Sequence, residues 1–586
     1  MQINFPELEY TARKKRIRHD SPVGKRRRWP TIGIEYMLSV AQQRFWHSRV
    51  GIEDAMLANR ERKSFHRLTI IGTLVVITGL LGGCTVGPNF TRPAAPEGKS
   101  YIPGNVASNL SPSAGEPAQH FVINQEIPAA WWRLFQSPPL NNVVQQAIAG
   151  SLTIEAAKAK LAQAQQAVLK EQGAYYPQID AAASAERQKG PPFAIGIRPS
   201  HDFPTFNLYS VGATVSFAPD VFGLTARLVE EQKALAENQA YQLAAAQLAV
   251  TGNTVNEALT IASVRLQIDA INTIVGDDEK TLALVRRKFV AGKVARTDML
   301  IVEARLESDR ALLPPLQQQV SVAEDALAIL VGKFPAEWVS PAFNLADFTL
   351  PADLPVSIPS ALVRQRPDIL AAEARLHAAS ASVGVADAQM YPNFILSASA
   401  GTAALSASSL GNGSNLIWTL FGGLSAPIFH GGALTAQKQG AIDSFHSTLA
   451  LYRQTVLEGL GQITDLLRSL DHDAELIQAQ HRAFEASGAV LDLQRLSYAA
   501  GKADLPRLLD AERNYQQANL GYIRAKTQRY LDSAQFFVAM GGGWWKDPAL
   551  CGDCRVQPIP TEKSAASSRS PASDTSPTPY DRLMNR

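Results

Sequence analysis

The sequence predicts a mostly α-helical chain that also contains membrane-type β structure. Two segments of 67 residues each, 223–289 and 433–499, are predicted to be helices with few breakers. Two shorter segments alternate in side-chain size and polarity, as strands do, and each has a neighbouring segment that would pair with it. The same order of helices and strand pairs occurs in both halves of the chain. These observations favour two internal repeats that form a long helical tube joined to a β-barrel.

The charge of the chain is unevenly distributed. Its 586 residues have a net charge of +3, but residues 1–83 carry 15 Lys and Arg against 7 Asp and Glu. The remainder is therefore mildly acidic and lacks the basic surface that nucleic acid requires, so no nucleic-acid partner is predicted. The hydrophobic content of 46% excludes a wholly disordered chain, and 3 cysteines exclude a disulfide-dense fold.

The N-terminal part of the chain is interpreted as an extension followed by a signal peptide. Residues 1–55 are basic and lack periodicity, which indicates a mis-annotated or disordered extension ahead of a start at Met56. A nuclear or nucleic-acid patch is the alternative. Residues 56–83 combine a basic beginning with an apolar run from Leu68 to Leu81, the pattern of a signal peptide.

The apolar run ends in a sequence that resembles the lipobox of bacterial lipoproteins, Leu81-Gly82-Gly83-Cys84. Cys84 would become the mature N-terminus and carry a diacylglycerol thioether and an N-acyl chain; no other cofactor is predicted. Three acyl chains suffice for stable membrane anchoring. Thr85, in place of an aspartate, favours release to the outer membrane. An uncleaved membrane anchor with an incidental cysteine is the alternative.

The mature chain begins with an extended leader and continues into long helices. Residues 84–139 are rich in Pro, Gly and Ser, which predicts the leader. A 67-residue helix would be about 100 Å long at about 1.5 Å per residue. It needs a coiled coil or a tube to bury its apolar stripe. The predicted helices are 140–174, 223–289, 296–332, 359–390, 433–499 and 504–540.

Two pairs of predicted strands interrupt the helices. In 208–217, larger side chains such as Tyr209 and Val211 alternate with smaller ones such as Ser210 and Gly212. Segments of about ten residues with weak alternation are typical of membrane strands, which are stable only in closed barrels. Four strands cannot close a barrel, so several subunits would have to contribute. Soluble hairpins that cap a helical bundle are the alternative. The predicted strands are 178–187, 208–217, 393–402 and 416–424.

Matching motifs support the internal repeat. Tyr176-Pro177 recurs as Tyr391-Pro392, and at a second offset Glu303 corresponds to Glu512. The segment Phe289-Val290-Ala291-Gly292-Lys293 recurs at that second offset as Tyr498-Ala499-Ala500-Gly501-Lys502. The repeats predict these domains: repeat 1 at 140–335, a linker at 336–357, repeat 2 at 358–545 and a disordered tail at 546–586.

Four short motifs follow one another in a characteristic order along the chain: Cys84-Thr85-Val86-Gly87-Pro88-Asn89-Phe90-Thr91-Arg92-Pro93, Trp131-Trp132-Arg133-Leu134-Phe135, Arg366-Pro367-Asp368-Ile369 and Ala426-Pro427-Ile428-Phe429. With these motifs, the lipobox and the internal repeat, the chain resembles the bacterial outer-membrane efflux factors, the TolC/OprM-like family, and within it the NodT-type lipoproteins of resistance-nodulation-division (RND) pumps. The resemblance extends from about Cys84 to Trp545. It implies a homotrimer in which each subunit gives four strands to a shared outer-membrane β-barrel and its helices to a long periplasmic tunnel.

The resemblance implies a passive exit duct and not an enzyme. The duct would be lipid-anchored in the cell outer membrane, extend into the periplasm, and work with a periplasmic adaptor and an inner-membrane RND-type pump. It leaves the exported compound open. A periplasmic coiled-coil adaptor lipoprotein is the alternative, although an adaptor would need one hairpin flanking a lipoyl-like module. An envelope enzyme is a third, but the sequence contains no nucleophile–base or metal constellation.

The resemblance also implies a gate at the two periplasmic turns that contain Gly292 and Gly501. In it, Tyr498 would donate a hydrogen bond to Asp298, next to Thr297, between neighbouring helices. Exposed hydrogen bonds and ion pairs are worth about 1 kcal/mol or less, so they can be exchanged reversibly when a gate opens.

Asp510 is the second implied gate residue. Three copies would form a carboxylate ring that narrows the pore and favours cations. Arg507 lies one turn earlier, and we expect it to pair with Asp510 and weaken the ring. Pro506 is tolerated only if it lies in the first turn of its helix. The alternative for Asp298 and Asp510 is ordinary solvated charge near helix N-termini.

A C-x-x-C motif lies in the tail, at Cys551 and Cys554. In the oxidising periplasm it predicts a small disulfide loop, with metal binding as the alternative. The ten histidines form no recognisable metal motif.

Overall fold

The structure is a computed structural model of the chain. It describes residues 85–96, 98, 100–102, 118–123, 125, 127–189 and 205–546. The predicted extension, the signal peptide, Cys84 and the C-x-x-C motif lie outside the described residues.

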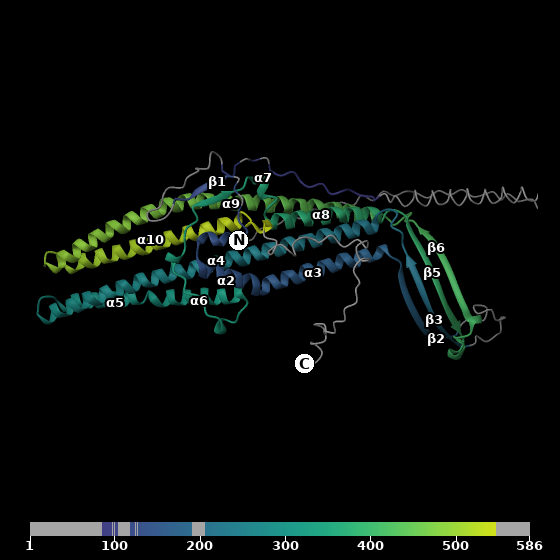
Figure 1. Cartoon of the computed structure of the whole chain (residues 1–586), viewed down its shortest axis with the longest axis horizontal. Coiled ribbons are helices and arrows are strands. Elements are labelled where there is room, and N and C mark those ends of the chain that lie inside the picture. Colours follow the sequence, from purple (N-terminus) through teal and green to yellow (C-terminus); the bar gives the residue numbers. More distant parts are fainter. Residues whose placement is uncertain are drawn as a thin grey trace, which may run out of the picture. The chain divides into compact units, whose positions relative to one another are not determined.

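The two halves of the chain contain the same order of elements: helix, strand pair, long helix, turn and helix (Figure 1). The first half comprises α2 (Pro138–Gly150), α3 (Leu152–Gln172), β2 (Gln178–Lys189), β3 (Thr205–Phe217), α4 (Leu224–Val290), α5 (Arg296–Arg310) and α6 (Leu313–Val331). The second comprises α7 (Pro359–Leu362), α8 (Pro367–Ala388), β5 (Asn393–Ala404), β6 (Leu416–Ser425), α9 (Ala433–Ala499) and α10 (Leu505–Ala539).

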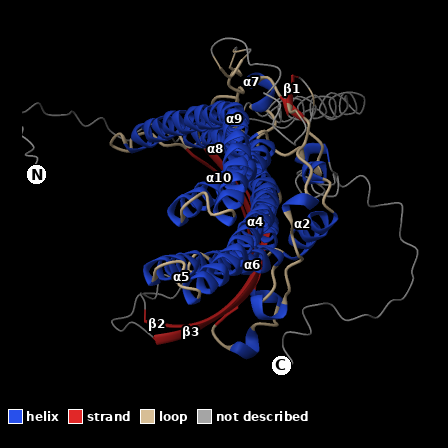
Figure 2. Ribbon diagram, turned by 90° about the vertical axis from the view of Figure 1, so that its left-hand side faces the viewer, coloured by secondary structure: helices blue, strands red, loops and turns tan. Residues whose placement is uncertain are grey.

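The long helices form as predicted. Both α4 and α9 contain 67 residues. Figure 2 shows α4 between α10 and α6, with α2 packed on its outer side, so the helices form a curved layer. A layer that is one to two helices thick leaves many apolar side chains exposed. Leu493 and Leu496 of α9, for example, are more than 60% exposed.

Three helices that were predicted as continuous are each divided in two, and backbone chemistry explains the breaks. Ser151 is extended between α2 and α3, with φ −66° and ψ 121°. Pro314 and Pro315 lie in the first turn of α6 and lack the amide hydrogens that would continue α5. Pro367 likewise starts α8, because the residue before a proline disfavours the helical conformation.

The four long strands form one antiparallel sheet in the order β2-β3-β5-β6. The repeats meet where β3 pairs with β5, and there Gly212 lies opposite Gly401. A Cβ atom at Gly401 would lie 2.5 Å from the carbonyl oxygen of Val211, so this close approach requires glycine. Within the described chain, β2 and β6 are edge strands, each paired on one side alone.

A second, two-stranded sheet was not predicted. β1 (His120–Ile123) of the leader pairs in parallel with β4 (Asp353–Val356) of the linker between the repeats. This pairing attaches the leader to the linker near the middle of the long helices (Figure 1).

The start of the leader is held by one buried arginine. Arg227 of α4, which is 3% exposed, donates hydrogen bonds to the carbonyl oxygens of Val86 (3.0 Å) and Gly87 (3.1 Å) and to Oδ1 of Asn89 (2.9 Å). Gly87 has φ +87°, and a Cβ atom there would lie 2.5 Å from Cα of Gly384 in α8. The leader thus bridges α4 of the first repeat and α8 of the second.

The main core lies where the leader, the linker and the helices meet. Its centre is Trp131, which is 1% exposed and stacks on Phe537 of α10 with ring centroids 5.6 Å apart. Phe135 packs edge-on against both rings. The Trp131–Phe135 motif therefore anchors the leader to the last helix.

Replacing the central tryptophan tests this core. Trp131→Ala should lower the free energy of unfolding by about 3–5 kcal/mol, because it opens a large cavity. Val339→Ala, at a position that is 89% exposed, should change it by less than about 0.5 kcal/mol. Thermal melts followed by circular dichroism compare the two. Equal melting temperatures would contradict the assignment of the core.

Candidate functional site

The two long helical hairpins end in turns of the same construction. Gly292 ends α4 with φ +69°, and Gly501 ends α9 with φ +73°, a conformation that glycine adopts without strain. In each turn the amide of the following lysine donates to a helix carbonyl five residues earlier, at 2.8 Å and 2.9 Å. These are glycine C-caps, and they fix the direction in which each chain returns.

Carboxylates cap both returning helices. Asp298, in the first turn of α5, accepts a hydrogen bond from the amide of Ala295 at 3.1 Å. Asp504 precedes α10 and accepts from the amide of Arg507 at 3.3 Å. Pro506 lies in the first turn of α10, where it is tolerated.

Tyr498 does not make the predicted hydrogen bond to Asp298. Its side chain is buried in a small core between the hairpins, and its hydroxyl has no hydrogen-bond partner within the described chain. Nζ of Lys288 lies 3.9 Å from the centre of its ring. Burial raises the pKa of the Tyr498 hydroxyl, and the charge of Asp298 raises it further. In this arrangement Asp298 caps α5 instead.

Asp298 and Asp510 nevertheless line the same cavity. Its volume is about 450 Å³, and it lies between α5 and α10 at the ends of the hairpins. Asp510 is exposed and pairs with Arg513 at 2.9 Å. The expected pair between Arg507 and Asp510 does not form, since Arg507 turns back to Asp504 at 3.6 Å. Both observed pairs place the acidic residue before the basic one, which is the favoured order on a helix.

The hairpins also contain a buried charge network that the sequence did not reveal. Nε of Arg305 lies 3.4 Å from Asp309 and 3.7 Å from Asp278. Its Nη1 donates to the carbonyl oxygen of Leu509 in α10 at 2.8 Å. Glu512 is buried close by, and among the described residues neither of its carboxylate oxygens has a hydrogen-bond partner. One guanidinium therefore lies beside two buried carboxylates, with a third close by, where α4, α5 and α10 meet.

Burial raises the pKa of Asp278 to about 7. A hydrogen bond with Asp309 and the charges of Asp309 and Glu512 add to the effect, and Arg305 opposes it. Burial also raises the pKa of Glu512, against Arg305 and Arg495. Because the folded pKa of Asp278 lies above its value in the unfolded chain, protonated Asp278 stabilises the hairpins. That contribution is complete well below pH 4 and is lost as the pH rises through about 7.

The contact between the hairpins should therefore loosen progressively between about pH 4 and pH 7 and change little above that. Amide hydrogen exchange along α5 and the facing part of α10, corrected for intrinsic rates, should speed up over this interval. Asp278→Asn should reduce the effect, whereas Asp325→Asn, at an exposed position on α6, should leave it unchanged. Undiminished pH dependence in Asp278→Asn would show that this group does not control the contact.

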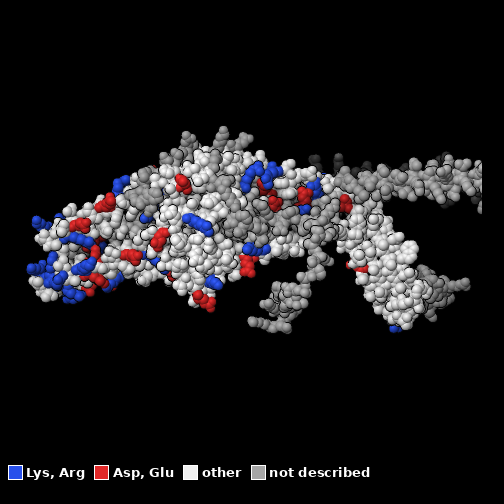
Figure 3. All heavy atoms as spheres, in the orientation of Figure 1, with Lys and Arg blue, Asp and Glu red and all other residues white. Residues whose placement is uncertain are grey.

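The described residues contain no group of three or more His, Cys, Asp or Glu side chains arranged to hold a metal ion. Lys and Arg side chains gather at the ends of the hairpins, interspersed with carboxylates (Figure 3). The visible face of the sheet carries little charge (Figure 3). The hairpin ends are therefore highly charged, whereas the visible face of the sheet, at the other end of the long helices, is mostly uncharged.

Comparison with known proteins gives concordant matches. The outer membrane efflux protein family matches residues 143–333 and 358–542. The pyoverdine export outer membrane protein OpmQ of Pseudomonas aeruginosa is 28% identical over 421 residues, which cover 71% of this chain and 88% of that protein. Nodulation protein T of Rhizobium leguminosarum bv. trifolii is 26% identical over 472 residues, or 79% of this chain and 96% of that protein.

Solved channel structures have the same fold. The outer-membrane channel OprN superposes with a TM-score of 0.69 at 28% identity, covering 79% of this chain and all of that one. The open-state MtrE outer membrane channel of Neisseria gonorrhoeae gives a TM-score of 0.67 at 23% identity, covering 78% of this chain and 98% of that one. The family match, extending over both repeats, shows that the chain belongs to the outer membrane efflux protein family, the outer-membrane channel components of efflux pumps.

Proposed function

We propose that three copies of this chain form a passive duct that carries small molecules across the outer membrane. The observation that supports it most strongly is the four-stranded sheet with its two edge strands, β2 and β6. Unpaired backbone groups are not tolerated in a bilayer, so both edges need partners. Three copies of four strands give twelve strands, enough to close a barrel with an open lumen.

The surface of the sheet supports a membrane location. Large apolar side chains on one face of β6 are more than half exposed: Leu416, Trp418, Leu420 and Leu424. Aromatic and aliphatic side chains on the outer face of a barrel are what the hydrocarbon layer and its interfaces select. The long helices would then extend from the barrel into the periplasm as a tunnel.

The partners follow from the class of protein. We infer a periplasmic adaptor that engages the hairpin ends and an inner-membrane RND-type pump that supplies the energy. Relatives are named for the export of pyoverdine, toluene and antibiotics. Such different cargoes in similar ducts suggest that the pump sets the choice of substrate.

We further propose that Cys84 carries a diacylglycerol and an N-acyl chain. A relative with 24% identity is named a probable outer membrane lipoprotein, SilC of Salmonella typhimurium. The residues that follow Cys84 in the sequence are held at the connection between β3 and α4. There the amide of Val86 donates a hydrogen bond to the carbonyl oxygen of Phe222 at 3.2 Å. A Cβ atom at Gly223 would lie 2.8 Å from Cα of Thr85. This contact holds the leader beside the sheet, where a lipid on Cys84 would reach the membrane.

We assign the gate to the hairpin ends. Asp298 and Asp510 line one cavity there, and in a trimer Asp510 would form the proposed threefold ring. Asp510 pairs with Arg513 within α10, and this exposed pair costs about 1 kcal/mol or less to break, so it leaves Asp510 available to the ring. The free hydroxyl of Tyr498 is available to Asp298 in a second arrangement of the hairpins.

Conductance in planar bilayers tests the duct and its gate together. Asp298→Ala combined with Tyr498→Phe should raise the single-channel conductance, because together they remove the hydrogen bond that the Tyr498 hydroxyl would donate to Asp298 in the second arrangement of the hairpins. Asp325→Asn on α6 is the control and should conduct like the parent. Conductance that the double change leaves unaltered would remove the gate assignment, and a protein that forms no channels would contradict the duct.

Loss of the acylated thiol should be visible directly. Cys84→Ser should abolish labelling with radioactive palmitate and leave a longer, unprocessed chain, since the modified cysteine is the processing site. Cys551→Ser serves as the matched control and should label normally. Normal processing of Cys84→Ser would mean that the lipobox has been misread.

A further inference from the structure

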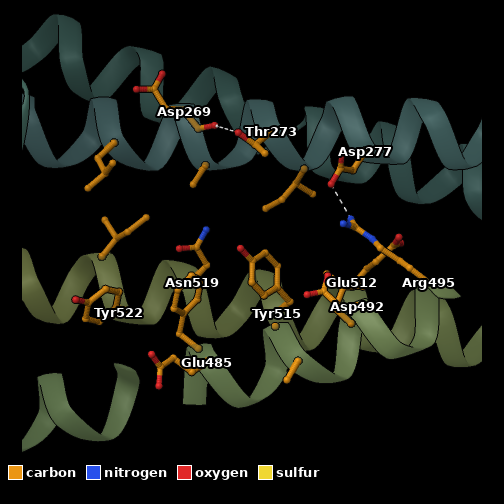
Figure 4. Close-up of a pocket in the computed structure, with 18 of the residues that line it drawn as sticks. Asp269, Thr273, Asp277, Glu485, Asp492, Arg495, Glu512, Tyr515, Asn519 and Tyr522 are labelled. Carbon is orange, nitrogen blue, oxygen red and sulfur yellow. Dashed lines mark hydrogen bonds and ion pairs between the residues drawn. The ribbon is translucent and has the colours of Figure 1, made fainter. Parts of the chain in front are cut away.

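A large pocket lies between α4 and the α9–α10 hairpin (Figure 4). Its volume is about 920 Å³, within the size range of sites that hold drug-sized molecules. It shares no lining residue with the cavity that contains Asp298 and Asp510.

The lining of this pocket is strongly acidic. Two cations face it, Arg495 and Lys526. Arg495 is already paired with Asp277 at 2.6 Å, seen at one end of the pocket in Figure 4. The lining includes six carboxylates: Asp269, Asp277, Asp278, Glu485, Asp492 and Glu512.

Glu512 lines this pocket as a buried carboxylate without a partner. It is 6% exposed, and neither of its oxygens has a hydrogen-bond partner in the part of the chain that the structure describes. Asp278, at 2% exposure, also has one oxygen without a partner. The charges of Arg305 and Arg495 act on Glu512, but Arg305 lies against Asp309 and donates to a backbone carbonyl, and Arg495 is paired with Asp277. A buried carboxylate in this position is stabilised by a proton or by an added cation.

Three aromatic rings form the apolar part of the pocket lining. Phe484 stacks on Tyr522 with ring centroids 5.8 Å apart and lies 5.3 Å from the ring of Tyr515. Leu266, Ile274 and Leu491 complete an apolar surface beside the carboxylates. Aromatic faces attract both apolar bodies and organic cations.

We propose that this pocket binds an amphipathic organic cation, an aromatic or apolar body that carries a protonated amine. The body would lie against Phe484, Tyr515 and Tyr522, and the amine would be the counter-charge of Glu512. The acidic lining disfavours organic anions. This site goes beyond the proposed duct, because a passive conduit requires no binding site in its helical wall.

Binding of a cationic dye to the purified full-length protein tests the proposal. Rhodamine 6G, followed by fluorescence anisotropy in a non-ionic detergent, should bind saturably, whereas the anionic dye fluorescein should bind at least about tenfold more weakly. Glu512→Gln should weaken rhodamine 6G binding about tenfold, because it removes the charge and keeps the shape. Glu303→Gln, at the matching position of the first repeat and outside the pocket, should bind like the parent.

A second variant guards against misfolding of Glu512→Gln. Asp269→Asn combined with Asp492→Asn changes two exposed carboxylates of the pocket and should also weaken rhodamine 6G binding, about threefold or more. Unchanged affinity in both variants, or equal affinity for fluorescein, would overturn the site. The same preparations are tested for channels in bilayers. Channels without dye binding would contradict the pocket alone, and a parent protein without channels would contradict the duct.

Discussion

A membrane strand must pair its backbone on both sides, and each copy of this chain supplies a sheet with two free edges. Four strands, β2-β3-β5-β6, cannot curve far enough to close on themselves. The remaining pairing must come from other copies. Once the barrel is shared, the helices that begin and end at its strands are also arranged around one axis. The curved layer of α4, α6, α9 and α10 then becomes one sector of a tunnel wall, and its exposed apolar side chains acquire neighbours.

Much of this architecture could be predicted because it is encoded locally. Long stretches with few helix breakers define α4 and α9, and alternation defines the strands. The pairing of β1 with β4 could not be predicted, because four-residue strands more than 200 residues apart carry no periodic signal. The burial of Asp278 and Glu512 could not be predicted for a different reason: carboxylates on an amphipathic helix are usually solvated, and nothing in the local sequence marks these as buried. Asp298 and Asp510 were found through the resemblance, but their actual partners depend on the geometry of each turn.

The hairpin ends combine a rigid frame with weak contacts. The glycine caps at Gly292 and Gly501 fix each turn, so a hairpin moves as a unit. The contacts between hairpins are a small apolar core around Tyr498 and a network in which Arg305 serves several carboxylates. Such a network is costly to bury and sensitive to protonation. A gate needs an interface of this kind, stable enough to close and poor enough in contact energy to open when a partner binds.

The most direct test of the central claim concerns assembly. Membranes from cells that express the chain are separated by density, and the outer-membrane fraction is run without heating on a denaturing gel. A shared barrel predicts a band at about three times the mass of the processed chain, which falls to the single-chain position after boiling. A single-chain band before boiling, found in the inner-membrane fraction, would contradict the shared barrel and the duct with it.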